Sequence, residues 1–128
     1  MTELTVSGRF DIDIAPAGAL LPNTGRFDFT KTWTGGIEGA SAGVMLSAGD
    51  PASGTAGYVA IEAFEGSIDG RTGTITFQQL GSMVDGTEAL RYEIVPGSGT
   101  GDLTTATGEL VLDVADGDHS VVLRLRLA

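Results

Sequence analysis

Alternation of apolar and polar side chains recurs about eight times along this chain, and it constrains the fold more than any other feature. A period of two is typical of a β-strand, whose successive side chains point to opposite faces. No stretch shows helical periodicity for longer than a turn or two. We therefore predict an all-β fold, with residues 1–128 forming a single antiparallel β-barrel of about eight strands, because closure removes the exposed sheet edges. A two-sheet sandwich is the alternative.

The segment from Tyr58 to Met83 gives the clearest strand signal. It contains two alternating runs separated by Asp69-Gly70, a pair that tolerates the positive φ angles of a tight hairpin turn. In the first run, one face carries Tyr58, Ala60, Glu62 and Phe64, and the other carries Val59, Ile61 and Ala63. In the second run, Ile75, Phe77 and Gln79 share one face, and Thr74, Thr76 and Gln78 share the other. The segment is therefore predicted to be a β-hairpin.

Shorter alternating runs predict the remaining strands. These are Leu4–Ile14, Phe27–Thr34, Ile37–Ala48, Leu90–Ile94, Glu109–Val114 and Ser120–Leu127. The segments between them are rich in Gly, Pro, Asp or Ser and are predicted to be turns and loops. Gly49–Gly57 is predicted to be a surface loop, and Val95–Gly101 is predicted to be too flexible for a regular element. Leu20 and Leu21 lie together in the loop after the first strand, either as a plug over one barrel end or as part of a subunit contact.

Composition excludes several classes of function. The formal net charge of −10 argues against nucleic-acid binding, which needs a basic patch, and against anionic membrane surfaces. The absence of cysteine excludes disulfides and a cysteine nucleophile, and it fits a cytoplasmic location. No apolar run approaches the length of a membrane span, and the first residues have no secretory-signal pattern. These features leave a water-exposed barrel whose interior is the natural place for function.

Two charged residues stand in otherwise apolar strands. Glu62 is flanked by Ile61 and Ala63, so it must face solvent, pair with a cation, or be neutral in a pocket. Lys31 lies between Phe29 and Trp33 on its strand face. If both side chains enter the barrel, each compensates the charge of the other, an arrangement that shifts pKa values and marks many functional sites. The alternatives are a purely structural buried pair, or two residues on the outer wall.

Other candidate motifs carry less chemistry. The glycine-rich run Pro96–Gly101 lacks the lysine and the helix of a phosphate-binding loop, so it is interpreted as a turn. Aspartate pairs such as Asp116 and Asp118 do not continue into a calcium-binding loop, and no metal site is predicted. The single histidine, His119, is interpreted as a solvated turn residue, which disfavours a hydrolytic triad.

Three stretches of this chain resemble a bacterial family of small barrels, the domain of unknown function 3224 family. They are KTWTGGIEG at Lys31–Gly39, YVAIEAFEGSIDGRTGTITFQQ at Tyr58–Gln79 and VPGSGTGDL at Val95–Leu103. The resemblance implies an allene-oxide-cyclase-like barrel, whose wider group also resembles dirigent proteins and spirotetronate cyclases. Those relatives bind apolar molecules and steer their cyclisation by shape, without a cofactor, and commonly self-associate. Two departures from the family pattern are Ala63, where an arginine is usual, and Gln79, where a histidine is frequent.

Two functions follow as hypotheses. The first is a cofactor-free cyclase or isomerase that folds a hydrophobic small molecule into a reactive conformer, with Glu62 as base and Gln79 donating a hydrogen bond to developing negative charge. The second is a non-catalytic barrel that binds or carries such a molecule. The candidate catalytic residues are Glu62, Gln79 and Lys31. The candidate substrate-binding residues are Trp33, Phe29, Phe64, Phe77, Gln78, Tyr92 and Tyr58. A homodimer or homotrimer is expected by analogy with related barrels.

Overall fold

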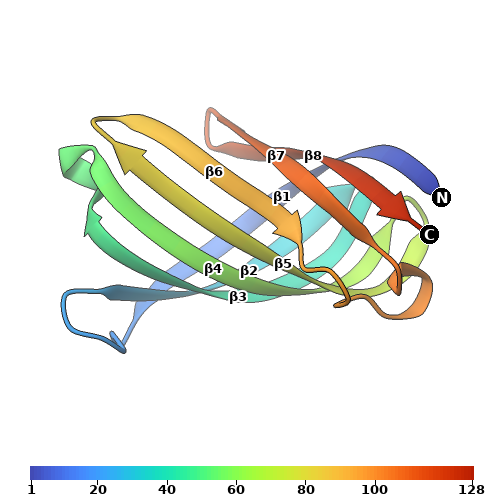
Figure 1. The fold of residues 1–128 in the computed structure, drawn as a ribbon, viewed down its shortest axis with the longest axis horizontal. Helices are drawn as coiled ribbons and strands as arrows, with labels where there is room; N and C mark the ends of the chain where they lie inside the picture. Colours follow the sequence, from blue (N-terminus) through green and yellow to red (C-terminus); the bar gives the residue numbers. More distant parts are fainter.

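The computed structural model describes residues 1–128 and is a closed, eight-stranded antiparallel β-barrel (Figure 1). The strands are β1 (Thr2–Ala17), β2 (Gly25–Gly35), β3 (Ile37–Asp50), β4 (Thr55–Ile68), β5 (Arg71–Val84), β6 (Thr87–Ile94), β7 (Thr107–Ala115) and β8 (Asp118–Leu127), with short 3₁₀ helices η1 (Pro51–Ser53) and η2 (Gly101–Leu103). Each strand pairs with its neighbours in sequence, and β8 pairs with β1 to close the sheet. The barrel prediction is confirmed, and the sandwich alternative is wrong. No helix has the length and apolar character needed to cross a membrane.

The β4–β5 hairpin forms as its alternation predicts. Asp69 and Gly70 both have positive φ, 50° and 78°, so they make the tight turn that the sequence indicated. The register places Glu62 opposite Phe77, and the buried positions on both strands fall on the face that points into the barrel. One face of the hairpin therefore builds the interior, while Ile61 and other alternate residues lie on the outer wall.

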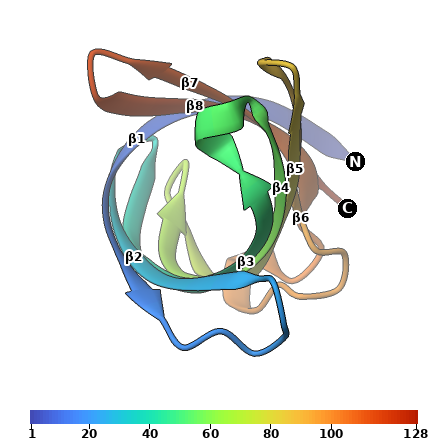
Figure 2. The ribbon, with the colours of Figure 1, turned by 90° about the vertical axis from the view of Figure 1, so that its left-hand side faces the viewer.

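The two ends of the barrel are built differently. We call one end the mouth; it is formed by residues 18–24, the η1 loop and the turns at 85–86 and 116–117. Figure 2 looks into this end. The opposite end, here the closed end, holds both termini, the turns at 35–36 and 69–70, and the segment 95–106. The predicted loop Gly49–Gly57 is shorter than expected, because β3 runs to Asp50 and β4 begins at Thr55.

The segment 95–106 seals the closed end. As predicted, Val95–Thr100 contains no helix or strand, and η2 begins only at Gly101; the segment is nevertheless held along the edge of β5. The backbone nitrogens of Val95 and Thr100 donate to the carbonyl oxygens of Thr76 and Thr74, at 2.8 and 2.9 Å. The Leu103 side chain is fully buried and joins the core of the closed end. The glycines of this segment allow it to lie close against β5.

The barrel wall is weakest between β6 and β7. These strands pair at one position only, Glu93 with Glu109, whereas β7 pairs with β8 over nine. The β7–β8 hairpin and the β5–β6 hairpin diverge toward the mouth (Figure 2). The ladder of backbone hydrogen bonds is therefore interrupted between β6 and β7 on the mouth side.

Candidate functional site

The interior of the barrel divides into a filled half and an open half. At the closed end, a core of seventeen buried residues fills the lumen. At the mouth, sixteen residues line a cavity of about 380 Å³, and nine of them are hydrophobic. The two halves meet at a layer of polar side chains. This layer and the cavity above it are the candidate site.

A charged network lies in the filled half, beneath the cavity. Lys31 Nζ on β2 donates to Glu62 Oε1 on β4, at 2.9 Å, and contacts Tyr92 Oη on β6 at 3.3 Å. Glu62 Oε1 also accepts from the Tyr92 hydroxyl, at 3.3 Å, and Glu62 Oε2 accepts from Ser41 Oγ. Ser41 in turn accepts from the indole nitrogen of Trp33, at 3.0 Å. We call these five residues the ion-pair network.

Aromatic rings enclose the ion-pair network. The Lys31 ammonium lies 4.2 Å from the centroid of the Phe10 ring and 5.2 Å from that of Phe29, within the range of cation–π attraction. Lys31 and Glu62 are only 4 % and 1 % exposed. Neither side chain lines the cavity. The Lys31–Glu62 pairing that the sequence suggested is therefore present as a buried ion pair.

Burial dominates the protonation behaviour of this network. Burial lowers the pKa of the Lys31 ammonium below its usual value, although the adjacent Glu62 carboxylate opposes this shift. Burial, with the charge of Glu62, raises the pKa of the Tyr92 hydroxyl well above its usual value. Glu62 accepts three hydrogen bonds, two at Oε1 and one at Oε2, and no buried side-chain nitrogen or oxygen lacks a partner. The carboxylate is therefore already held by the protein's own donors.

A second polar pair lies between this network and the mouth. The Tyr58 hydroxyl donates to Gln79 Oε1, at 2.9 Å, across β4 and β5. The Tyr58 ring lies over Gly81, where an added Cβ would come within 2.4 Å of the ring. Burial, and the charge of Glu88, raise the pKa of the Tyr58 hydroxyl. Tyr58 therefore forms part of the cavity wall and separates the cavity from the charged layer below.

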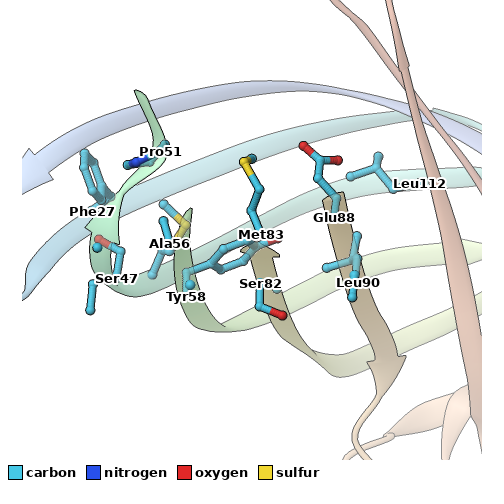
Figure 3. Close-up of a pocket in the computed structure, with 16 residues that line it drawn as sticks. Phe27, Ser47, Pro51, Ala56, Tyr58, Ser82, Met83, Glu88, Leu90 and Leu112 are labelled. Atoms are coloured by element: carbon cyan, nitrogen blue, oxygen red, sulfur yellow. The ribbon is translucent and has the colours of Figure 1, made fainter. Parts of the chain in front are cut away.

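The cavity itself is apolar, with polar groups at its edge. Its lining residues come from β2 to β7 and from η1: Phe27, Met45, Ser47, Ala48, Gly49, Pro51, Ala56, Gly57, Tyr58, Gly81, Ser82, Met83, Glu88, Ala89, Leu90 and Leu112. In Figure 3, Met83 and Glu88 point to the same side of the β5–β6 pair, while Ser82 points away from them. No group of three or more His, Cys, Asp or Glu side chains is placed to hold a metal ion.

The predicted site residues separate into three groups. The side chains of Lys31, Trp33, Phe29, Phe64, Glu62, Phe77 and Tyr92 are all buried inside the barrel. Tyr58 alone among the predicted residues lines the cavity, and Gln79 contacts it from below. Gln78 is not a lumen residue: it lies on the opposite face of β5 from the buried Phe77 and donates to Glu93 on β6, at 2.9 Å. Gln78 therefore lies outside the lumen, because adjacent residues of a strand point to opposite faces, and its role in substrate binding stays a prediction.

Several residues of the site were not predicted. Phe27 lies two residues from Phe29 on β2, and Leu90 lies two residues from Tyr92 on β6, so each points to the same inward face as its neighbour. The alternation of the sequence could therefore have predicted both. Ser41 was missed as well, although the turn after β2 places it directly opposite Lys31 in the strand register. Met83 and Leu112 lie near strand ends, where the sequence gives no sign of which positions border an open cavity.

Leu20 and Leu21 do not plug the barrel. They are 63 % and 61 % exposed and lie in a groove on the outer wall beside Leu46, Val59 and Leu80. The plug prediction is wrong because the 18–24 loop turns outward over β3–β5 rather than across the opening. The subunit-contact alternative stays a prediction.

His119 is also placed differently from its prediction. It belongs to β8 rather than to a solvated turn, and it is half-buried. Its ring stacks on Phe10 with centroids 4.9 Å apart and an interplanar angle of 26°. It therefore covers the edge of the aromatic layer around Lys31 and makes no ion pair.

Comparison with known proteins agrees with this architecture. A family model described as "Protein of unknown function (DUF3224)" matches residues 6–125. A solved structure from Shewanella oneidensis MR-1, described as a protein with unknown function from the DUF3224 family, is 36 % identical in sequence. Its similarity covers 99 % of this chain and 98 % of that chain, with a TM-score of 0.92. No curated protein matches the chain.

Proposed function

Because the chain belongs to the DUF3224 family, which is defined by sequence and not by an activity, we propose its function from geometry: it binds a small, mainly apolar molecule in the cavity at the mouth. The observation that carries this proposal is the cavity of about 380 Å³, which falls within the usual range of small-molecule sites. The cavity is lined mainly by hydrophobic side chains and opens to solvent. Such a surface is occupied more favourably by an apolar molecule than by water.

The composition of the lining supports an apolar ligand. Phe27, Met45, Leu90 and Leu112 are among the apolar side chains that line the cavity, and Met83 adds a flexible thioether that adapts to different shapes. Each ~100 Å² of apolar surface removed from water contributes about 2.5 kcal/mol. A ligand that fills this cavity gains its affinity mainly from this term, while Tyr58 and Gln79 supply a polar contact at the cavity floor.

A cofactor-free cyclase or isomerase is the second candidate. Its support is the ion-pair network, a set of buried ionisable groups directly beneath the cavity, of the kind that many active sites contain. Catalysis by Glu62 requires the ligand to pass Tyr58 and to reach a buried carboxylate that already accepts three hydrogen bonds. The non-catalytic function is favoured because it requires neither step.

Fluorescence provides a direct test of binding. Trp33 is the only tryptophan of the chain and lies in the filled half of the barrel, so energy transfer from Trp33 reports a fluorescent apolar probe such as N-phenyl-1-naphthylamine in the cavity. We expect saturable binding to the wild-type protein. Ala56→Phe fills the mouth from an inward position of β4 and is expected to weaken the probe's affinity by about tenfold or more.

The matched control is Ala63→Phe, which makes the same change on the exposed outer face of β4. It should leave the affinity of the probe unchanged. Urea unfolding of both variants establishes that each is folded. Equal affinity in Ala56→Phe and the wild type, or equal weakening by both variants, would show that the cavity is not the binding site.

A further inference from the structure

We infer that the preferred ligand is an apolar amine, with its positive charge held at the mouth and its apolar body in the cavity. This inference rests on the proposed function and specifies the chemical class of the ligand. Glu88 is the only charged residue among the sixteen that line the cavity, and no lysine, arginine or histidine is among them. A cationic head group therefore meets a carboxylate, whereas an anionic one meets the same charge as its own.

Glu88 is positioned to contact such a ligand. Along β6 it continues the alternation of the buried Tyr92 and the cavity-lining Leu90, so it belongs to the inward face of the strand. In Figure 3 its carboxylate points toward Leu112 of β7, which lines the same cavity. Its charge is also felt at the Tyr58 hydroxyl, whose pKa it raises. The carboxylate is therefore coupled electrostatically to the cavity.

The chain itself provides no cation for Glu88. The seven lysine and arginine residues all form ion pairs with other carboxylates: Arg9 with Asp118, Arg26 with Asp28, Lys31 with Glu62, Arg71 with Asp69, Arg91 with Glu93, Arg124 with Glu3, and Arg126 with Glu109. An anionic ligand thus finds no free lysine or arginine anywhere on the molecule. Glu88 remains the unpaired charge at the cavity.

The surroundings of the mouth have the same sign. The turns and loop ends at the mouth contain Asp50, Asp85, Asp116 and Asp118, and the net charge of the chain is −10. The potential of such a surface concentrates cations and repels anions. In addition, the aromatic side chains of Phe27 and Tyr58 line the cavity, and the face of an aromatic ring attracts a cation. The apolar lining of the cavity favours a ligand with an apolar body, and the negative charge at the mouth favours a cationic amine over a neutral or anionic head group.

Competition against the fluorescent probe tests the inference with three ligands that share one chain and differ in head group: octylamine, octanol and octanoate. At neutral pH we expect the order amine, alcohol, carboxylate from tightest to weakest. The amine should exceed the alcohol by about fivefold, the upper end for a solvent-exposed ion pair. Glu88→Gln should remove most of this advantage and leave the affinity for octanol unchanged.

The control variant is Glu65→Gln, which removes the same charge from an exposed, outward position of β4. It should preserve the advantage of the amine. If Glu65→Gln reduces this advantage as much as Glu88→Gln does, net charge accounts for the effect and the assignment to Glu88 is wrong. If octanoate binds as tightly as octylamine, the inference fails while the proposed function stands. If neither the probe nor any of the three ligands binds, the proposed function itself fails.

Discussion

The closed end and the mouth of this barrel are built from the same strands, yet one is filled and the other is hollow. At the closed end, large rings meet in the lumen: Trp33 lies 6.1 Å from Phe64 and 5.9 Å from Phe77, between ring centroids. At the mouth, several positions of the same strands are small, including Ala56 and Gly81. Except between β6 and β7, the strand pairing runs through both halves. Side-chain size at the inward positions therefore determines where the cavity lies.

The walls of the two halves differ as well. The segment 95–106 runs along β5 and closes the filled half with Leu103 and Ala106. On the mouth side, β6 and β7 separate beyond the single pair of Glu93 and Glu109. The filled half is consequently sealed by backbone and side chains together, whereas the open half contains the cavity and has little strand pairing between β6 and β7. We therefore expect the filled half to contribute most of the stability, and the proposed binding to belong to the open half.

The two halves are expected to differ most in how much stability is lost when a carboxylate is removed. Glu62→Gln leaves the Lys31 ammonium buried without its counter-charge, which should lower the free energy of unfolding by about 3–5 kcal/mol. Glu88→Gln changes an exposed side chain without an ion-pair partner, and should alter stability by less than about 0.5 kcal/mol. Urea unfolding followed by Trp33 fluorescence measures both.

The double variant Lys31→Met/Glu62→Gln is the control for the charged pair. It removes the buried ammonium together with the carboxylate, so it should recover part of the stability lost in Glu62→Gln. An unfolding free energy for Glu62→Gln within about 1 kcal/mol of the wild type would mean that the pair is hydrated, and that the filled half is not sealed.

Substituting a glycine in each half tests the same comparison, with a smaller expected loss of stability than for Glu62→Gln. A Cβ at Gly43 would lie 2.3 Å from the Phe29 ring and 2.7 Å from the Ile61 carbonyl oxygen, inside the filled half. Gly43→Ala should therefore cost about 1–3 kcal/mol, the usual range for overpacking. A Cβ at Gly81 would lie 2.4 Å from the Tyr58 ring, and that ring borders the open cavity and can move into it.

We accordingly expect Gly81→Ala to cost less than about 1 kcal/mol in stability, and to weaken probe binding because the displaced ring occupies the cavity. The two variants are measured side by side by urea unfolding and probe titration. Equal costs of unfolding would contradict the distinction between a filled and an open half.

The sequence predicted the barrel well, because alternation and turn residues are local signals. Asp69-Gly70 and the inward face of Glu62 follow directly from strand periodicity. The position of the cavity does not, since it depends on which strands face one another across the lumen and on how rings such as Tyr58 fold over small neighbours. The outward position of Gln78, by contrast, does follow from the sequence, because strict alternation places it on the opposite strand face from Gln79.

Loops were predicted least well. Leu20 and Leu21 are apolar, but nothing local indicates whether a loop crosses the barrel opening or turns onto the outer wall. The segment after Val95 has the composition of a flexible linker, yet its backbone finds partners along β5. In both segments the outcome is decided by contacts that are distant in sequence, which a reading of local pattern does not contain.

The smallest expected effect concerns the two tyrosines of the chain, one in each half, whose hydroxyl groups should ionise at different pH values. Burial raises the pKa of Tyr58 above its usual value of 10.0, and raises that of Tyr92 much further. A raised folded-state pKa contributes stability that is present below pH 10.0, the unfolded value, and is lost as the pH rises through the folded value. Ultraviolet absorbance of tyrosinate should therefore show no transition at pH 10.0, then ionisation of Tyr58, and last that of Tyr92 as the protein loses stability. Tyr58→Phe should delete the earlier transition alone; if both transitions disappear or merge at the usual pKa, the sealed layer around Tyr92 does not exist.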